Sequence, residues 1–453
     1  MRSLDRINEY VNIVCRQMRW KKAHIRVSEE MKNHIVDGRD SYMEQGFDEE
    51  TATEKALIDT GDATTIGTQL DRIHRPKPQW GMFVATAALL TLGILIRLFI
   101  FRDEDRAGLL SIRLFYTGIG VAGMIAAYFT DFTIIGKYPK TIYFGVALLL
   151  LAMLLFSPTV QGKVFYAQYI ILLFPLAFTA IIYATRNLKY LGMLICGLAF
   201  WLLSFITLFV PSVSGYFHFL IISVALLGIT IYKKWFGVKR IYGFLVMLFP
   251  LAIPSLIFFI GNAYRWNRLA VALNPYLDPT GPGYIGIMTR KLLRSAILFG
   301  RGNIPGEYIV GVTEPNRIFY TDLFLTALIS LLGWIAFAII ISAILIFIVI
   351  GFKRCFKQKS SLGLFVSISI MMTFCMQAIS YIAYNFGFQL AAPISLPLIS
   401  YGNTATVINL VLIGFMLSVF RTGDAVIDKT DSPSSTRNRL FSICSFRKYV
   451  KQR

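Results

Sequence analysis

The sequence predicts an all-α, polytopic membrane protein with about ten transmembrane helices, plus a small soluble helical domain at its N-terminus. Hydrophobic residues make up 56% of the 453 residues and charged residues only 15%, whereas a soluble protein carries about 25% charged residues. Apolar runs of about 18 residues or more also recur along the chain, and this is the length that crosses a bilayer as a helix.

Residues 1–78 form the predicted cytoplasmic helical domain. Apolar residues recur there at helical spacing, and Gly46 and Gly61 are each followed within two residues by an Asp suited to cap the next helix. The pattern predicts three or four short helices, ended by a stiff linker, Arg75-Pro76-Lys77-Pro78. Residues 42–74 resemble the helical prefix domain found ahead of some membrane proteins of Gram-positive bacteria. A regulatory or partner-docking unit and a passive cap are both compatible with this pattern.

Residues 79–420 form the predicted membrane domain. Ten apolar runs predict its spans, at 81–101, 114–135, 141–156, 164–184, 188–210, 216–232, 241–260, 321–350, 362–383 and 405–420. Because ten is an even number, the two ends of this domain lie on the same side of the membrane. The basic, Ser/Thr-rich tail 421–453 is expected to be a disordered segment attracted to anionic lipid.

The charge of the short loops predicts the orientation of the spans. The four loops that follow even-numbered spans carry twelve Lys and Arg residues. The loops after odd-numbered spans carry Arg102, Arg106, Arg113 and Lys163, and Asp103, Glu104 and Asp105 offset the first three. The positive-inside rule therefore places both termini in the cytoplasm and the loop after the seventh span outside. The net charge of +20 comes with no nucleic-acid-binding motif, so no nucleic acid is expected as a partner.

That outer loop, residues 261–317, is the predicted functional segment, since loops longer than about 12–15 residues are commonly functional. Its basic surface suits an anionic, lipid-linked substrate such as a polyprenyl pyrophosphate, which Arg binds through paired hydrogen bonds. Attraction to lipid headgroups alone is the alternative. Asp278, on a turn rich in Pro and Gly, has the chemistry of a general base or a metal ligand. The candidate substrate-binding residues of this loop are Arg268, Asn274, Arg290, Lys291 and Arg294.

A second unusual segment follows the ninth span. Residues 384–410 contain Pro393 and Pro397 and then Ser400-Tyr401-Gly402, which together predict a broken or re-entrant segment. We expect it to pack beside the 261–317 loop. Gln168 and Gln377, inside predicted spans, are expected to join helices by hydrogen bonds.

Four features coincide in order along residues 80–420. The first is the ten-span plan with its long outer loop after the seventh span. The second is the run Tyr264-Arg265-Trp266-Asn267-Arg268, Asn274-Pro275 and Asp278-Pro279-x-Gly281-x-Gly283-Tyr284. The others are Thr321-Asp322, which is similar to an H-T-D motif, and Leu396-Pro397-Leu398-Ile399-Ser400-Tyr401-Gly402, which is similar to L-P-F-I-S-Y-G. Together they resemble the SEDS family (shape, elongation, division and sporulation), the RodA/FtsW/SpoVE group.

The resemblance implies a peptidoglycan glycosyltransferase that polymerises lipid II at the outer face of the bacterial cell membrane, in cell-wall synthesis, cell shape or division. It also implies a class B penicillin-binding protein as partner. The family's catalytic aspartate corresponds to Asp278, and Asp322, Ser400 and Tyr401 fall in its other motifs, where they are expected to bind substrate. No cofactor is established by this pattern. A divalent cation (Mg²⁺ or Mn²⁺) at Asp278 is compatible with the carboxylate, although no preassembled set of ligands accompanies it.

The sequence departs from the family pattern at four places. Tyr320 stands where the family has the His of H-T-D, and Asn403 replaces a second Gly after Gly402. Residues 330–333 lack the family's acids, and residues 162–173 lack its R-W…Q-P-S-E motif. These departures keep open a second function, namely a non-catalytic protein that binds or translocates lipid II or its polyprenyl carrier. A solute transporter is disfavoured, because no inverted repeat of broken helices is present.

Overall fold

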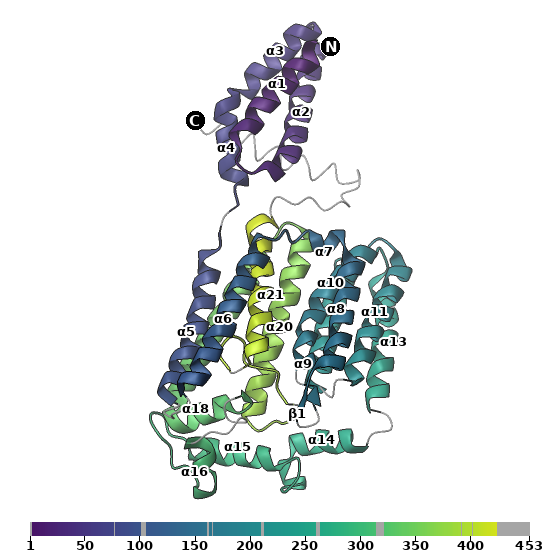
Figure 1. Cartoon of the computed structure of the whole chain (residues 1–453). Helices are drawn as coiled ribbons and strands as arrows, with labels where there is room; N and C mark the ends of the chain where they lie inside the picture. The colour runs from purple at the N-terminus through teal and green to yellow at the C-terminus, as the bar shows by residue number, and fades with distance from the viewer. Residues whose placement is uncertain are drawn as a thin grey trace. The chain divides into compact units, whose positions relative to one another are not determined.

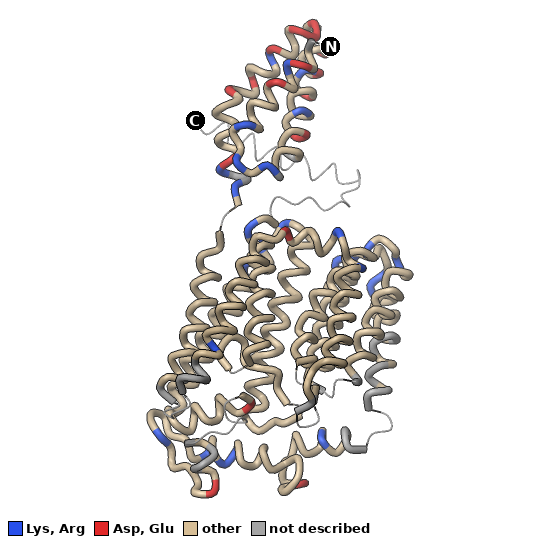
Figure 2. Tube along the Cα trace, in the orientation of Figure 1, with Lys and Arg blue, Asp and Glu red and all other residues tan. Residues whose placement is uncertain are grey.

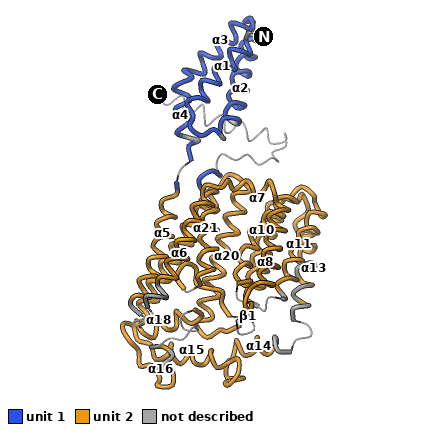
Figure 3. The backbone as a smooth tube through the Cα atoms, viewed as in Figure 1, with its two compact units in different colours: residues 1–78, 421–453 blue, residues 79–420 orange. Residues whose placement is uncertain are grey.

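The computed structural model describes residues 2–76, 78–100, 106–160, 163–164, 166–209, 213–259, 263–313, 321–390, 392–400 and 402–423. The chain divides into two compact units, residues 1–78 with 421–453 and residues 79–420 (Figure 3). Among the described residues the fold is helical apart from one short antiparallel ribbon of two strands, β1 (Thr159–Val160) and β2 (Lys163–Val164). The all-α prediction is thereby confirmed.

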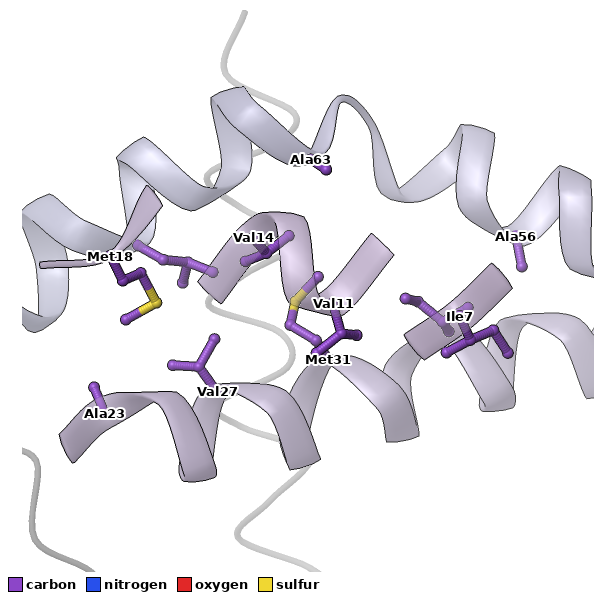
Figure 4. Packing of buried hydrophobic residues seen from close by; sticks show 11 residues of the cluster. Ile7, Val11, Val14, Met18, Ala23, Val27, Met31, Ala56 and Ala63 are labelled. Atoms are coloured by element: carbon purple, nitrogen blue, oxygen red, sulfur yellow. The ribbon is translucent and has the colours of Figure 1, made fainter. Parts of the chain in front are cut away.

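The first unit consists of four helices, as Figure 1 shows: α1 (Arg2–Gln17), α2 (Lys21–Glu44), α3 (Glu49–Thr60) and α4 (Ala63–His74). The two predicted Asp caps are present, since the Asp48 carboxylate accepts a hydrogen bond from the Thr51 amide at 3.2 Å and that of Asp62 from the Thr65 amide at 2.8 Å. Hydrogen bonds from Thr64 and Thr65 lower the pKa of Asp62 to about 2. The buried faces of the helices meet in one apolar core, part of which Figure 4 shows: Ile7, Val11, Val14, Met18, Ala23, Val27, Met31, Ile35, Ala56, Ala63 and Leu70.

The second unit is a bundle of long apolar helices (Figure 1). Among the described residues, eight helical segments are long and apolar enough to cross a membrane. They lie in α6 (Arg106–Phe129), α8 (Pro139–Phe156), α9 (Ala167–Ile170) with η1 (Ile171–Leu173) and α10 (Phe174–Thr185), α11 (Lys189–Phe209), α12 (Val213–Tyr232), α19 (Trp334–Cys355), α20 (Ser361–Asn385) and α21 (Asn403–Thr422). Two further helices, α5 (Trp80–Ile100) and α13 (Arg240–Phe259), occupy the predicted first and seventh spans, and the short α7 (Ile134–Lys137) links α6 to α8. The membrane-protein prediction is confirmed.

The eighth predicted span is interrupted. Helix α18 (Phe324–Leu332) ends at Gly333, whose φ is +87°, and α19 begins at Trp334. Residues 297–302 bridge the break, because the carbonyls of Ile297 and Leu298 accept hydrogen bonds from the Trp334 and Ile335 amides, each at 3.1 Å. The spanning helix thus begins at Trp334, and the prediction of a continuous span from residue 321 was wrong. Apolar composition does not reveal a break whose helix ends are satisfied by a distant segment.

Replacing Gly333 by Ala is expected to destabilise the fold by about 1–3 kcal/mol, because a side chain is strained at this positive φ. The new Cβ would also lie 2.6 Å from the Leu298 carbonyl oxygen. The midpoint of detergent-induced unfolding, followed by Trp fluorescence, measures the change. Gly118→Ala in α6 is the matched control, since its Cβ would meet nothing within 4 Å. Equal stability of the two variants would contradict the capping role of residues 297–302.

Arg113 is buried inside the second unit, at 2% exposure. Its guanidinium donates hydrogen bonds to three successive carbonyls, those of Ser400 (3.0 Å), Leu398 (3.1 Å) and Ile399 (3.1 Å). Leu398 has a φ of +63°, which is uncommon for a residue with a side chain. Counting Arg113 among the loop cations was therefore wrong, because α6 begins at Arg106 and carries Arg113 into the bundle.

Polar side chains join the central helices. The amides of Gln377 on α20 and Asn409 on α21 exchange two hydrogen bonds of 3.1 Å, which confirms the predicted role of Gln377. His218 on α12 is buried, with Nδ1 2.6 Å from the Ser214 carbonyl oxygen and Nε2 3.0 Å from the Ser380 hydroxyl of α20. Satisfied pairs of this kind set the register of helices that are otherwise uniformly apolar.

Candidate functional site

Asp278 lies on a tight turn that its own side chain stabilises. The turn follows α14 (Ala263–Leu273) and the short helix η2 (Pro275–Leu277), which the Asn274 side chain caps by accepting a hydrogen bond from the Tyr276 amide at 3.2 Å. The Asp278 Oδ1 atom accepts a hydrogen bond from the Gly281 amide at 3.0 Å. Its Oδ2 atom has no hydrogen-bond partner in the part of the chain that the structure describes, and the residue is partly exposed. The carboxylate is thus fixed by one oxygen and leaves the other available.

The two glycines of this turn are required by close backbone and side-chain contacts. A Cβ on Gly281 would lie 2.5 Å from Asp278 Oδ2, and one on Gly283 would lie 2.0 Å from the Pro275 carbonyl oxygen. Any side chain at position 281 would therefore displace the carboxylate, and any at 283 would push the turn open. This gives a physical reason for the D-P-x-G-x-G pattern.

The candidate cations of α15 (Tyr284–Ser295) have different surroundings. Arg290 donates to the Gly387 carbonyl at 3.4 Å, and its guanidinium lies over the Phe388 ring at 5.5 Å from the centroid. Lys291 forms an ion pair of 3.0 Å with Glu307 on α16 (Gly306–Thr313). The contact of Arg290 confirms that residues after the ninth span pack beside the 261–317 loop.

The Lys291–Glu307 pair remains charged at neutral pH. Hydrogen bonds to Glu307 and then Tyr308 raise the pKa of Lys291, and the bond from Lys291 lowers the pKa of Glu307. The pair is therefore lost only as the pH falls through the lowered pKa of Glu307 or rises through the raised pKa of Lys291. Both side chains are about half exposed, at 48% and 56%, so the pair adds little to stability. Arg294, one turn further along α15, is exposed.

A third group of residues gathers at the C-terminal end of α20. The Asn385 side chain accepts a hydrogen bond from the Thr326 amide at 3.0 Å and donates one to the Asp322 carbonyl at 2.9 Å. Two predicted residues that are far apart in sequence, Arg268 of α14 and Asp322, each lie within range of an electrostatic interaction with the Tyr384 hydroxyl.

One apolar core lies under these groups. It is formed by α15, α16, α18 and the end of α20, through Met288, Leu292, Ile304, Tyr308, Val312, Leu323, Ala327 and Tyr384. The segment after α13 is therefore a folded layer over the bundle, which Figure 1 shows crossing the helix ends.

The sequence prediction missed Tyr384, Asn385, Gly387 and Phe388. They stand in the run Tyr384-Asn385-Phe386-Gly387-Phe388 at the end of the ninth span. The signal available in the sequence was an Asn at the end of an apolar run with a Gly two residues later. The structure buries Asn385 and gives Gly387 a φ of +84°.

Ser400 has a structural role in the turn that contains it. It is buried, its Oγ accepts a hydrogen bond from the Leu396 amide at 2.8 Å, and its carbonyl accepts one from Arg113. Its hydroxyl therefore stabilises its own turn, and a contact with substrate stays a prediction. Tyr401, together with Arg317 and Tyr320, lies outside the described residues.

The described residues contain no group of three or more His, Cys, Asp or Glu side chains arranged to hold a metal ion. Asp278 has one carboxylate oxygen directed to a backbone amide, so Oδ2 is the oxygen that this side chain offers to a cation.

Comparisons with known proteins agree with this architecture. The profile of the FtsW/RodA/SpoVE cell cycle proteins matches residues 80–424. The probable peptidoglycan glycosyltransferase FtsW of Idiomarina loihiensis is 25% identical over 203 residues, which cover 43% of this chain and 48% of that protein. The peptidoglycan glycosyltransferase MrdB of Escherichia coli K12 is 26% identical over 180 residues, which cover 40% of this chain and 48% of that protein. The chain spans about half the length of the curated relatives it matches.

Two solved structures share the fold. One belongs to a peptidoglycan synthase complex that coordinates polymerization and crosslinking, with a TM-score of 0.56, 18% identity and coverage of 76% of this chain and 98% of that chain. The other is the rod shape determining protein RodA of Thermus thermophilus, with a TM-score of 0.50, 15% identity and coverage of 78% of this chain and 98% of that chain. Because the profile match extends over most of the chain and includes both the helical bundle and the Asp278 turn, this protein belongs to the FtsW/RodA/SpoVE family.

Proposed function

We propose that this protein is a SEDS-type peptidoglycan glycosyltransferase, which polymerises lipid II at the outer face of the cytoplasmic membrane. The observation that carries this proposal is the Asp278 carboxylate, held by the Gly281 amide on a glycine turn with Oδ2 available. The relatives named as peptidoglycan glycosyltransferases support the reaction class.

In this reaction Asp278 Oδ2 takes the proton from a sugar hydroxyl of the acceptor. The freed oxygen attacks the anomeric carbon of the donor chain, and the bond from that carbon to the pyrophosphate oxygen breaks. Undecaprenyl pyrophosphate leaves with the electron pair, and the displacement inverts the anomeric centre to give a β-linkage. Cations of the segment, with the exposed Arg294 and the half-exposed Lys291 as candidates, stabilise the negative charge of the leaving group.

The proposed orientation has both termini in the cytoplasm, which puts Asp278 outside. It rests on the Lys and Arg residues of the short loops on the opposite side. The proposed partner is a class B penicillin-binding protein, whose crosslinking chemistry fits the synthase complex that shares the fold. The first unit, which resembles a Gram-positive prefix domain, suggests a Gram-positive bacterial source.

A second candidate function is binding or translocation of lipid II without catalysis. It is favoured by the surroundings of the cations, because Glu307 neutralises Lys291 and Arg290 is directed to Gly387 and Phe388. The departures at Tyr320 and Asn403 point the same way.

Lipid II polymerisation by the purified protein decides between the two functions. Wild-type protein is incubated with lipid II in detergent, alone and with a candidate class B penicillin-binding protein, and the glycan products are separated on a gel. Polymer formation supports the glycosyltransferase. Saturable binding of lipid II by a protein that forms no polymer in either mixture would establish the second function.

Gly281→Ala is expected to lower the polymerisation rate at least tenfold with little change in stability. The new methyl group would lie only 2.5 Å from Asp278 Oδ2, which is too close for two non-bonded atoms, so the carboxylate must rotate away from its place. Initial rates are compared with those of Gly306→Ala, a glycine of the same segment where a Cβ meets nothing within 4 Å. Equal rates for the two variants would show that the position of the carboxylate is unimportant.

A further inference from the structure

The first unit has two ends of opposite charge. Five exposed cations lie in the turn between α1 and α2 and in the last turn of α4, and we call them the basic end: Arg16, Arg19, Lys21, Arg72 and Arg75. The far half of α2 and α3 carries exposed acids, here called the acidic end: Asp37, Asp40, Glu44, Glu49, Glu50 and Glu54. In Figure 2 the Lys and Arg residues of this unit lie mainly in the half that contains the C-terminal end of α4, and Asp and Glu lie mainly in the half that contains the N-terminus.

Hydrogen bonds fix this division of charge. The Arg19 amide donates to Asp71 Oδ1 at 2.9 Å, which joins the turn between α1 and α2 to the last turn of α4. Asp71 is thereby held away from solvent, with its side chain 11% exposed, whereas the side chain of Arg19 is 80% exposed. The surface at this end therefore presents the cation more than the acid. At the other end Arg39, which is 17% exposed, pairs with Asp40 and Glu49. The other acids of the acidic end, Asp37, Glu44, Glu50 and Glu54, stand exposed. The unit is therefore an electric dipole with a definite direction.

The basic end also carries apolar surface. Ile25 stands one turn after Lys21 on α2 and is 72% exposed, and Trp20 is half-buried against the core of the unit. Exposed cations near in sequence to an exposed aliphatic side chain and a Trp are the composition that binds the headgroup region of anionic lipid. A partner that binds through charge alone, such as nucleic acid, would leave the exposed Ile25 side chain without an apolar contact.

The short segment between the basic end and helix α5 also favours anionic lipid as the binding partner. Chain leaves the basic end at Arg75 and α5 begins at Trp80. Four residues separate them, so the two points are at most about 18 Å apart along the chain. A group tethered this closely to a membrane span meets the bilayer surface at a high effective concentration. Each Lys or Arg near an anionic surface raises binding about fivefold.

We propose that the basic end of the first unit docks on anionic lipid headgroups of the leaflet beside it, with the acidic end directed away. The dipole selects this direction, since an anionic surface attracts one end and repels the other. Docking of this kind goes beyond glycosyl transfer and needs neither lipid II nor a protein partner. It gives the first unit a defined, salt-sensitive position at the membrane.

Full-length protein in nanodiscs tests this proposal. A polarity-sensitive fluorophore is attached at Ile25→Cys, or at Glu50→Cys as the acidic-end reference, after replacement of Cys15, Cys375 and Cys444 by Ser. In discs with about one third phosphatidylglycerol the label at position 25 should shift to a less polar environment, and in pure phosphatidylcholine it should not. Raising the salt concentration tenfold should reverse the shift, because the Debye length shortens. The label at position 50 should stay unchanged throughout.

Matched charge reversals isolate the basic end. Arg16→Glu with Lys21→Glu should reduce the docked-to-free ratio about 20-fold or more, since two favourable cations are lost. Arg6→Glu with Lys32→Glu changes the net charge by the same amount at exposed positions of the same unit. This control variant should retain most of the fluorescence shift at position 25. Thermal unfolding in detergent verifies that both variants fold.

Four results would overturn the proposal. Three are equal shifts at positions 25 and 50, equal loss in the two double variants, and no dependence on phosphatidylglycerol. The fourth is a shift seen only in native membranes, which would assign the basic end to a protein partner instead.

Discussion

Asp278→Asn is expected to lower the turnover number for lipid II polymerisation about 100- to 10,000-fold, the range that loss of a general base produces. The Asn side chain has nearly the same size and retains an oxygen that can accept the Gly281 amide hydrogen bond, seen at 3.0 Å. The turn should therefore keep its shape while its amide cannot take a proton from the acceptor hydroxyl. The KM for lipid II should change less than about threefold, because the lost interaction develops only in the transition state.

Initial rates over a range of lipid II concentrations measure both constants. Glu307→Gln is the matched control, since it neutralises another carboxylate of the same 261–317 segment, one that pairs with Lys291. It should retain polymerisation. Similar rates for Asp278→Asn and wild type would remove Asp278 from the chemistry, and the binding or translocating function would then account better for the site.

Arg113→Met is expected to destabilise the second unit by about 3–5 kcal/mol, or to prevent folding. The arginine is 2% exposed and donates to the carbonyls of residues 398, 399 and 400. Met fills a similar volume but donates nothing, so three carbonyls lose their donor in an apolar region. A Cβ on Gly93 of α5 would lie 2.9 Å from the Ile399 carbonyl oxygen, so the surrounding helices are packed too closely for an easy rearrangement.

Detergent-induced unfolding measures this effect. Arg294→Met removes an exposed arginine of α15 and should change stability by less than about 0.5 kcal/mol. Arg113→Lys should recover only part of the loss, because one ammonium group cannot reach three carbonyls in the geometry of the guanidinium fork. If Arg113→Met were as stable as the wild type, the turn at 398–400 would not depend on the hydrogen bonds from Arg113.

Sequence patterns predicted the class of this protein because long apolar runs have few alternatives to membrane helices. They likewise predicted the helical first unit with its caps at Asp48 and Asp62. They also singled out the Asp278 turn, whose part in catalysis stays a prediction. These features are local: a cap, a turn or a span is determined by residues within a few positions of each other. The family match over residues 80–424 agrees with those predictions.

Tertiary structure alone decided which distant residues share the site. Arg268 and Asp322 both lie within electrostatic range of Tyr384, and residues 297–302 cap a break that divides an apparently continuous span at Gly333. It also showed that Arg113, predicted to lie in a loop, is buried and donates hydrogen bonds to the carbonyls of residues 398–400. The Ser400 hydroxyl likewise bonds to the Leu396 amide of its own turn. Composition reports the average environment of a segment, whereas these contacts depend on pairing between segments far apart in the chain. That pairing is fixed by the need to satisfy buried polar groups, which no local pattern records.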